Sequence, residues 1–183
     1  NHVDNAFFDG KIDQIRIFNK ALTSTEVTTL YDEVYCQPTI VPTDYFNPVI
    51  YTGDAGNNGN TLSKTVTGVG FQPDFVWGKS RNAAVPNVLF DSVRGAEKWL
   101  NSDNTNAEAN NQYTQATFLS DGFTTGTSDG LNKTNIDFVA WNWKAGGADV
   151  LNEEGTIDSQ VSANTDAGFS IVSYTGNGNT SQQ

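Results

Sequence analysis

Residues 136–144 read Ile-Asp-Phe-Val-Ala-Trp-Asn-Trp-Lys, and this stretch indicates the fold. Successive residues of a strand point to opposite faces, so an extended segment here would be apolar on both faces for most of its length. Such a strand is typical of the middle of a sheet that lies between two layers. Residues 75–77, Phe-Val-Trp, form a second run of this kind. We therefore predict an antiparallel β-sandwich built around these two runs.

The bulky rings of these runs form the predicted structural core. Each buried aromatic side chain removes about 150–250 Å2 from water, and burial contributes about 25 cal/mol for each Å2. Burying these rings would thus supply much of the driving force for folding. The core residues that we predict are Phe75, Trp77, Phe138, Trp141 and Trp143.

Other strand-like runs surround them at short intervals, separated by turn signals at residues 58–59, 68–70, 121–122 and 129–130. The stretch 95–112 is different, because it is rich in Asn and Ala. There we expect a short helix with a long loop, or a solvated loop. The sequence as a whole predicts an all-β, jelly-roll-like fold. The predicted strands cover residues 47–52, 61–67, 73–79, 86–93, 115–119, 122–126 and 136–144.

One phrase of the sequence occurs twice. Residues 46–53, Phe-Asn-Pro-Val-Ile-Tyr-Thr-Gly, recur as residues 169–176, Phe-Ser-Ile-Val-Ser-Tyr-Thr-Gly. Asn-Gly-Asn-Thr then follows in both copies, at 58–61 and at 177–180. The separation between the copies is that of a whole domain, which indicates modules in tandem. We expect the chain to be a window on a longer array, with a second unit starting at residue 169.

The N-terminal region reads as the end of another domain. Residues 7–18 alternate between apolar and polar, which predicts a hairpin or a pair of half-buried strands. Thr23 and Glu26 have the spacing of a capping box, and apolar residues follow at helical spacing, so we predict a helix over about 24–34.

These signals divide the chain into five segments. Two prolines in residues 37–45 indicate a stiff linker. The expected organisation is the end of a sandwich (1–36), the linker (37–45), a β-sandwich unit (46–147), a connector with an edge strand (148–168) and the start of a second unit (169–183).

Charge and composition narrow the function classes. The net charge is −11 with only ten Lys and Arg residues, which argues against binding nucleic acid or an anionic membrane surface. Cys36 is the one cysteine, so no disulfide can form within the chain. His2 is the one histidine and has no nucleophile near it in sequence, and Glu153-Glu154 would face opposite ways in a strand. We therefore expect no enzymatic activity.

Two loops have the composition of calcium sites. Ca2+ takes six to eight oxygen ligands from flexible loops. Asp, Asn and Gly are also ordinary turn formers, so a plain turn is the alternative for both loops. The first loop offers Asp54, Asn57, Asn58 and Asn60, and the second offers Asp121, Asp129 and Asn132.

Three aromatic residues lie in polar, loop-like surroundings and are candidates for glycan binding. Sugar sites combine an exposed ring with Asp or Asn acceptors, and the alternative is ordinary, partly buried packing. The candidates are Trp99, Tyr113 and Tyr45.

Residues 8–31 carry the pattern Phe-x-Gly-x-Ile-Asp-x-Ile-Arg-Ile-Phe-Asn-x-Ala-Leu-Thr-x-x-Glu-Val-x-x-Leu-Tyr. This pattern resembles the closing segment of laminin-G-like, concanavalin A-type jelly-roll domains. The resemblance implies a final strand followed by a short helix over about residues 7–34. It carries over no binding residue, because that family's usual calcium and sugar loops correspond to positions before residue 1.

The rest of the chain, residues 47–183, resembles the uncharacterised repeat domain of tail-fibre-like structural proteins from marine tailed phages. The resemblance is carried by the motifs at 51–53, 68–77, 89–95, 120–123, 139–147, 159–164 and 167–172. It implies a virion-surface, extracellular protein that is trimeric, contacts other virion proteins and binds host surface glycans. Two alternatives stay open: a capsid-decorating head fibre, and a secreted carbohydrate-binding or carbohydrate-degrading protein with several modules.

Overall fold

The computed structural model describes residues 16–33, 40–55, 63–110 and 116–178. The chain divides into two compact units, Asn1–Thr39 and Ile40–Gln183. Helix α1 (Ser24–Glu33) lies in the first unit and confirms the predicted helix. Its capping box is present: the Thr23 N–H donates to Glu26 Oε2 over 2.8 Å, and the Glu26 N–H donates to Thr23 Oγ1 over 3.3 Å. Most of the predicted hairpin at 7–18 lies outside the described residues.

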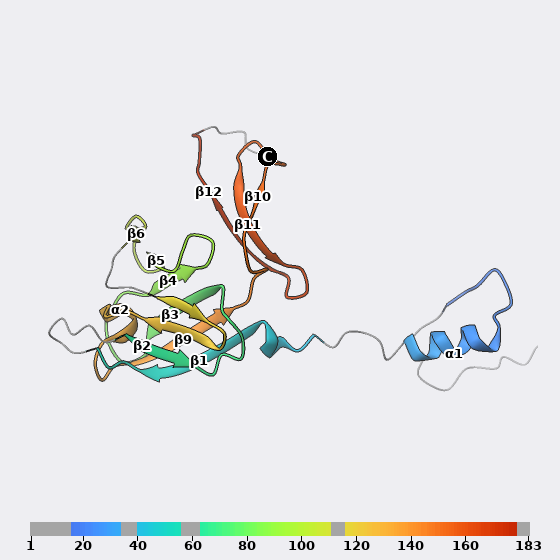
Figure 1. Cartoon of the computed structure of the whole chain (residues 1–183), viewed down its shortest axis with the longest axis horizontal. Helices are drawn as coiled ribbons and strands as arrows, with labels where there is room; N and C mark the ends of the chain where they lie inside the picture. Colours follow the sequence, from blue (N-terminus) through green and yellow to red (C-terminus); the bar gives the residue numbers. More distant parts are fainter. Residues whose placement is uncertain (1–15, 34–39, 56–62, 111–115, 179–183) are drawn as a thin grey trace, which may run out of the picture. The chain divides into compact units, whose positions relative to one another are not determined.

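The second unit is an all-β, sandwich-like fold, as the sequence predicts (Figure 1). A short 3-10 helix, η1 (Pro42–Asp44), precedes its first strand. All of its paired strands run antiparallel. Its elements are β1 (Phe46–Thr52), β2 (Lys64–Thr67), β3 (Phe75–Ser80), β4 (Val88–Asp91), β5 (Lys98–Asn101), β6 (Ala109–Asn110), β7 (Thr117–Leu119), β8 (Gly122–Thr125), α2 (Asp129–Asn132), β9 (Asp137–Trp143), β10 (Val150–Asn152), β11 (Ser159–Asn164) and β12 (Phe169–Tyr174).

The large sheet has six strands in the order β1-β9-β3-β4-β5-β6, so β9 is an interior strand as predicted. β9 pairs with β1 on one side and with β3 on the other. Burial nevertheless alternates along β9: Phe138 and Ala140 are fully buried, whereas Trp141 and Trp143 are half-buried. Only one face of β9 therefore lies under a complete second layer within the described residues.

The second layer is the three-stranded sheet β2-β8-β7 together with α2. Phe123 on β8 and Val66 on β2 pack against Val76 and Phe90 of the large sheet. Leu131 on α2 fills the space over Gly78, where an added Cβ would overlap its side chain. The core of the unit lies between these two layers.

Three features differ from the sequence expectations. Residues 95–110 contain the unpredicted strands β5 and β6, which pair with each other, and the expected solvated loop is present as the exposed stretch 102–108 between them. The predicted turn at 129–130 begins helix α2, where the Ser128 side chain accepts a hydrogen bond from the Gly130 N–H. Of the predicted core, Phe138 is fully buried, and the other four rings (Phe75, Trp77, Trp141 and Trp143) are half-buried on the opposite face of the sheet.

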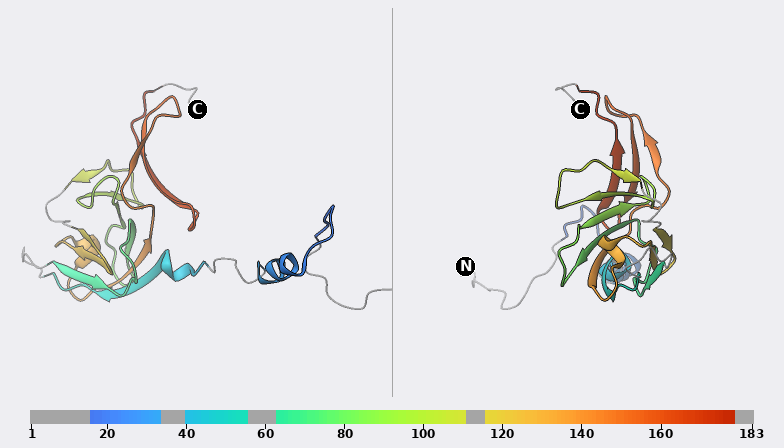
Figure 2. Two further views of the ribbon diagram at one scale, coloured as in Figure 1. Left: turned by 45° about the vertical axis from the view of Figure 1, so that its right-hand side comes forward. Right: turned by 90° about the vertical axis from the view of Figure 1, so that its left-hand side faces the viewer.

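Strands β10, β11 and β12 form a separate sheet that runs as a twisted ribbon (Figure 2). β11 is its middle strand, not an edge strand as expected for the connector. The loop after β9 holds this sheet through hydrogen bonds: the Gly146 N–H donates to Ser162 Oγ over 3.0 Å, and Ser162 Oγ donates to the Gly147 oxygen over 2.7 Å. Phe169 adds a ring contact with Trp143 at 6.0 Å.

Candidate functional site

The structure separates the three residues predicted to bind glycans. Trp99 lies on β5, where its ring packs against the core and its Nε1 is buried with no hydrogen-bond partner among the described residues. Tyr45 is half-buried after η1, and its carbonyl oxygen accepts from the Lys144 N–H over 2.8 Å. Tyr113 lies outside the described residues. Trp99 is therefore a packing residue and not an exposed platform for a sugar.

The candidate calcium ligands are occupied by protein partners where the structure describes them. Asp54 makes an ion pair with Lys64 at 2.9 Å, and Asp129 makes one with Lys133 at 3.1 Å. Asn132 is buried and accepts from the Asp54 N–H over 2.9 Å. Asn57, Asn58 and Asn60 lie outside the described residues. No three His, Cys, Asp or Glu side chains gather into a possible metal site in the described part of the chain.

Asp121 has a structural role at the turn between β7 and β8. Its carboxylate accepts from the N–H groups of Gly70 (2.6 Å) and Gly68 (3.1 Å), and these bonds lower the pKa of the Asp121 carboxyl. Both glycines have positive φ, the conformation that aims their N–H groups at one anion. The carboxylate therefore closes the 68–70 loop onto the β7–β8 turn.

The outer face of the large sheet carries a cluster of rings that includes four of the five predicted core residues. Cross-strand neighbours point to the same side of a sheet, so the pairings of β1, β9 and β3 put these side chains on one surface. Trp77 and Trp141 lie 5.3 Å apart at an angle of 52°. We call this surface the aromatic face, and it consists of Phe46, Pro48, Phe75, Trp77, Trp141 and Trp143.

The aromatic face has a covered end and an open end. Phe169 from β12 lies against Phe75 at 6.2 Å and against Trp143 at 6.0 Å. Trp77 and Trp141 are half-buried, and among the described residues no ring of the β10–β12 sheet contacts them. Rings at one end therefore anchor the second sheet. Those at the open end are partly exposed, while Trp77 Nε1 is buried with no hydrogen-bond partner in the described part of the chain.

Polar groups border the open end. Asp137 stands on the same face of β9 as Trp141, and its carboxylate accepts from Thr52 Oγ1 over 2.8 Å and from Asn82 Nδ2 over 3.2 Å. Asp137, Arg81 and Thr52 line a pocket of about 240 Å3 at this edge. This pocket and the tilted Trp77–Trp141 pair therefore lie on one face of the sheet, with Val139 between Asp137 and Trp141 on β9.

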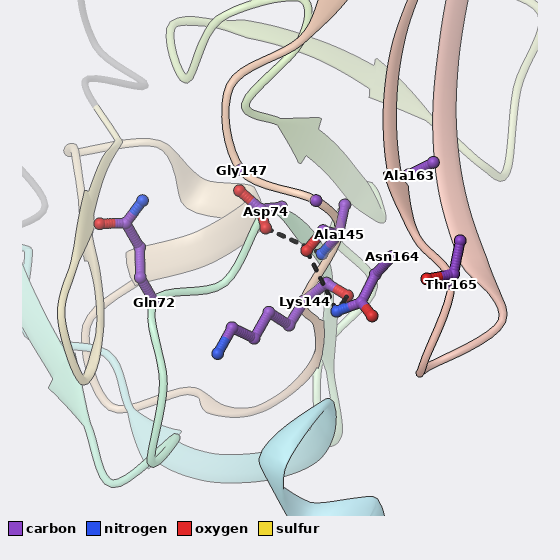
Figure 3. Close-up of a pocket in the computed structure, with 9 residues that line it drawn as sticks. Gln72, Asp74, Lys144, Ala145, Gly147, Ala163, Asn164 and Thr165 are labelled. Carbon is purple, nitrogen blue, oxygen red and sulfur yellow. Dashed lines mark hydrogen bonds between the residues drawn. The ribbon is translucent and has the colours of Figure 1, made fainter.

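A second pocket, of about 370 Å3, lies where the loop after β9 meets the β11–β12 turn (Figure 3). Asp74 is buried in its wall, and its Oδ2 accepts from the Ala145 N–H over 2.8 Å. Asn164 Nδ2 donates to the carbonyl oxygens of Lys144 and Ala145 at 3.4 and 3.3 Å. The Lys144 side chain extends away from these bonds along the pocket.

The chemistry of this second pocket is that of a structural joint. Its polar groups hold the loop in place. The backbone is also closely packed there, since a Cβ added to Gly146 would overlap the Ala163 carbonyl oxygen. The residues that line it include no aromatic ring, so it offers no stacking surface for a sugar. The aromatic face is therefore the better candidate for ligand binding.

Comparison with known proteins identifies the family. Residues 41–182 match the family described as Domain of unknown function (DUF7483). This chain belongs to that family. The DUF7483 match runs through the sandwich and the β10–β12 sheet without a break, and it begins within two residues of the second unit.

Two other comparisons add no relative. No curated protein and no solved structure matches the chain. Neither helix in the described part of the DUF7483 chain has the length and apolar character needed to cross a bilayer.

Proposed function

We propose that this DUF7483 protein is a non-enzymatic structural module of a virion fibre, in which it spaces and presents glycan-binding surfaces. The viral setting is supported by the resemblance of residues 47–183 to repeat domains of tail-fibre-like phage proteins. The observation that carries the adhesive part of the proposal is the open end of the aromatic face. There Trp77 and Trp141 contact one another on the sheet surface, and Asp137 lies on the same face of β9, four residues from Trp141.

The spacing role is supported by the way the two sheets of the second unit are fastened. The backbone of the loop after β9 donates hydrogen bonds to the side chains of Ser162 and Asp74 and accepts from the side chain of Asn164. Such a joint limits bending between the sandwich and the β10–β12 sheet. Repeated contacts along a fibre then raise the avidity of individually weak sugar sites.

A glycan array probed with the full chain tests the adhesive role. We expect binding to at least one class of bacterial surface polysaccharide, and we expect Trp141→Ala to weaken it about tenfold, because loss of the ring removes the stacking surface. Tyr174→Ala is the matched control, since it removes an exposed ring that lies on the β10–β12 sheet. Absence of binding by the full chain, or equal binding by Trp141→Ala, contradicts the adhesive role.

Immunogold labelling of virions that carry this chain tests the fibre role. Label on tail appendages supports the proposal. Label confined to the capsid surface contradicts the tail-fibre role and favours the head-fibre alternative.

A further inference from the structure

β1 and β12 carry the two copies of the repeated phrase, yet they bury opposite faces. In β1, Val49 and Tyr51 point into the core while Ile50 is 70% exposed. In β12, the counterparts of Val49 and Tyr51 are Val172 and Tyr174, which are 51% and 67% exposed. The face of the pattern that packs inward in β1 is therefore exposed to solvent in β12.

In β1, this face contacts side chains of the neighbouring strand β9. The ring of Tyr51 stacks on Phe138 of β9 at 5.4 Å and 15°, and its hydroxyl donates to the Leu131 carbonyl oxygen over 2.8 Å. Val49 stands opposite Ala140 in the same pair of strands. A neighbouring strand with Phe and Ala two residues apart thus flanks the inward face of β1.

In the part of the chain that the structure describes, β12 pairs only with β11 and has no such neighbour on its other side. The face that holds Val172 and Tyr174 continues across the sheet to Val150, which is 65% exposed. A Cβ added to Gly53, next to β1, would overlap the Lys133 carbonyl oxygen, whereas one added to its counterpart Gly176 meets nothing within 4 Å. Apolar surface on β12 is therefore left open where β1 is enclosed.

β12 is also an edge strand without the usual protection. Exposed edges are commonly blocked by Pro, Lys or a very short strand. β1 contains Pro48, β10 has three residues and β6 has two. β12 has six residues, with neither Pro nor a charged side chain. Within the described residues its outer edge is unpaired, so it can accept another strand.

We propose that β12 is a docking strand for a β9-type strand from another module, added antiparallel along its free edge. Following the β1–β9 register, the incoming strand places a Phe opposite Tyr174 and a small residue opposite Val172. Main-chain hydrogen bonds supply affinity in such strand addition, and alternate side chains supply specificity. The β9 strand of a second copy is already paired on both sides, so an intact copy does not offer the partner.

Titration of the full chain with a labelled peptide tests this proposal. The peptide has the sequence of residues 136–144 followed by a solubilising lysine tag, and fluorescence anisotropy follows its binding. We expect saturable binding that the double variant Val172→Ser/Tyr174→Ser weakens about tenfold or more. Ile50→Ser is the matched control, because Ile50 is 70% exposed on the edge strand β1 and its replacement should leave peptide binding unchanged.

Three results would overturn the proposal. The first is no binding, or equal binding by the double variant. The second is equal binding by a peptide carrying Phe138→Asp and Ala140→Asp, which would show adhesion without strand specificity. The third is dimerisation of the full chain in light scattering that the double variant abolishes, since the occupant would then be a second copy. None of these results depends on glycan binding, so the two proposals fail separately.

Discussion

The buried hydroxyl of Tyr51 makes the stability of the fold depend on pH. Burial raises the pKa of Tyr51 above its ordinary value near 10, because the phenolate would lose hydration. The protonated form is therefore favoured in the folded state. The contribution of Tyr51 to the unfolding free energy is complete below about pH 10. It falls as the pH rises further, because the Tyr51 hydroxyl ionises first in the unfolded chain.

Tyr51→Phe tests this account. At pH 8 we expect the variant to lose about 1–2 kcal/mol of unfolding free energy, since the Leu131 carbonyl loses its partner. Above pH 10 the wild type should lose stability more steeply than the variant. Urea unfolding at several pH values measures both effects, and parallel pH profiles for the two proteins would contradict the assignment.

Gly53 and Gly176 form a matched pair at the same position of the repeated phrase. Gly53→Ala should destabilise the protein by about 2 kcal/mol or more, because the added Cβ meets backbone atoms of Asn132 and Lys133 that cannot move freely. Gly176→Ala should change stability by about 0.5 kcal/mol or less, since the space there is open. Thermal unfolding compares them, and equal losses would mean that the two positions are equally enclosed.

At the scale of the element, β9 shows what alternation can and cannot predict. Its pattern indicates an interior strand, and the structure places it between β1 and β3. The pattern gives no sign of which face lies under the second layer, because both faces carry large rings. That choice depends on β8 and α2, whose Phe123 and Leu131 share a buried cluster with Ala140, while Trp141 lies on the opposite face.

The two faces of the large sheet predict different costs for the same substitution. Phe138 is fully buried, so Phe138→Ala should lower the unfolding free energy by about 3–5 kcal/mol. Phe46 is 36% exposed on the aromatic face, so Phe46→Ala should cost about half of that or less. Chemical denaturation monitored by tryptophan fluorescence measures both, and an equal cost would show that the outer face is also a closed core.

The segment around β5 shows a second limit of predicting structure from local sequence. Residues 95–112 lack the alternation of a strand, yet β5 pairs with β4 through Leu89 and Leu100. Arg94 fixes the preceding turn through ion pairs with Asp91 at 2.6 Å and with Glu108 at 3.0 Å. Partners that lie on other segments decide this local structure, so a local pattern does not reveal it.

For the whole molecule, the division into two units predicts independent folding of the larger one. All four tryptophans lie in the second unit. A chain of residues 40–183 should therefore show the same unfolding free energy as the full chain, within about 0.5 kcal/mol, when tryptophan fluorescence follows unfolding in urea. A markedly lower midpoint for the shorter chain would show that the first unit stabilises the second.

The all-β class, the helix with its capping box and the interior position of β9 could be predicted from the sequence, because each depends on residues that are close together in the chain. The division of the rings between the core and the aromatic face could not be predicted, because it depends on the packing of distant segments. The repeated phrase shows the reason: the two copies share Phe, Val, Tyr, Thr and Gly, yet the Val and Tyr face inward in β1 and outward in β12. A side chain's surroundings are supplied by segments distant in sequence, and alternation along a strand specifies two faces without specifying what covers them.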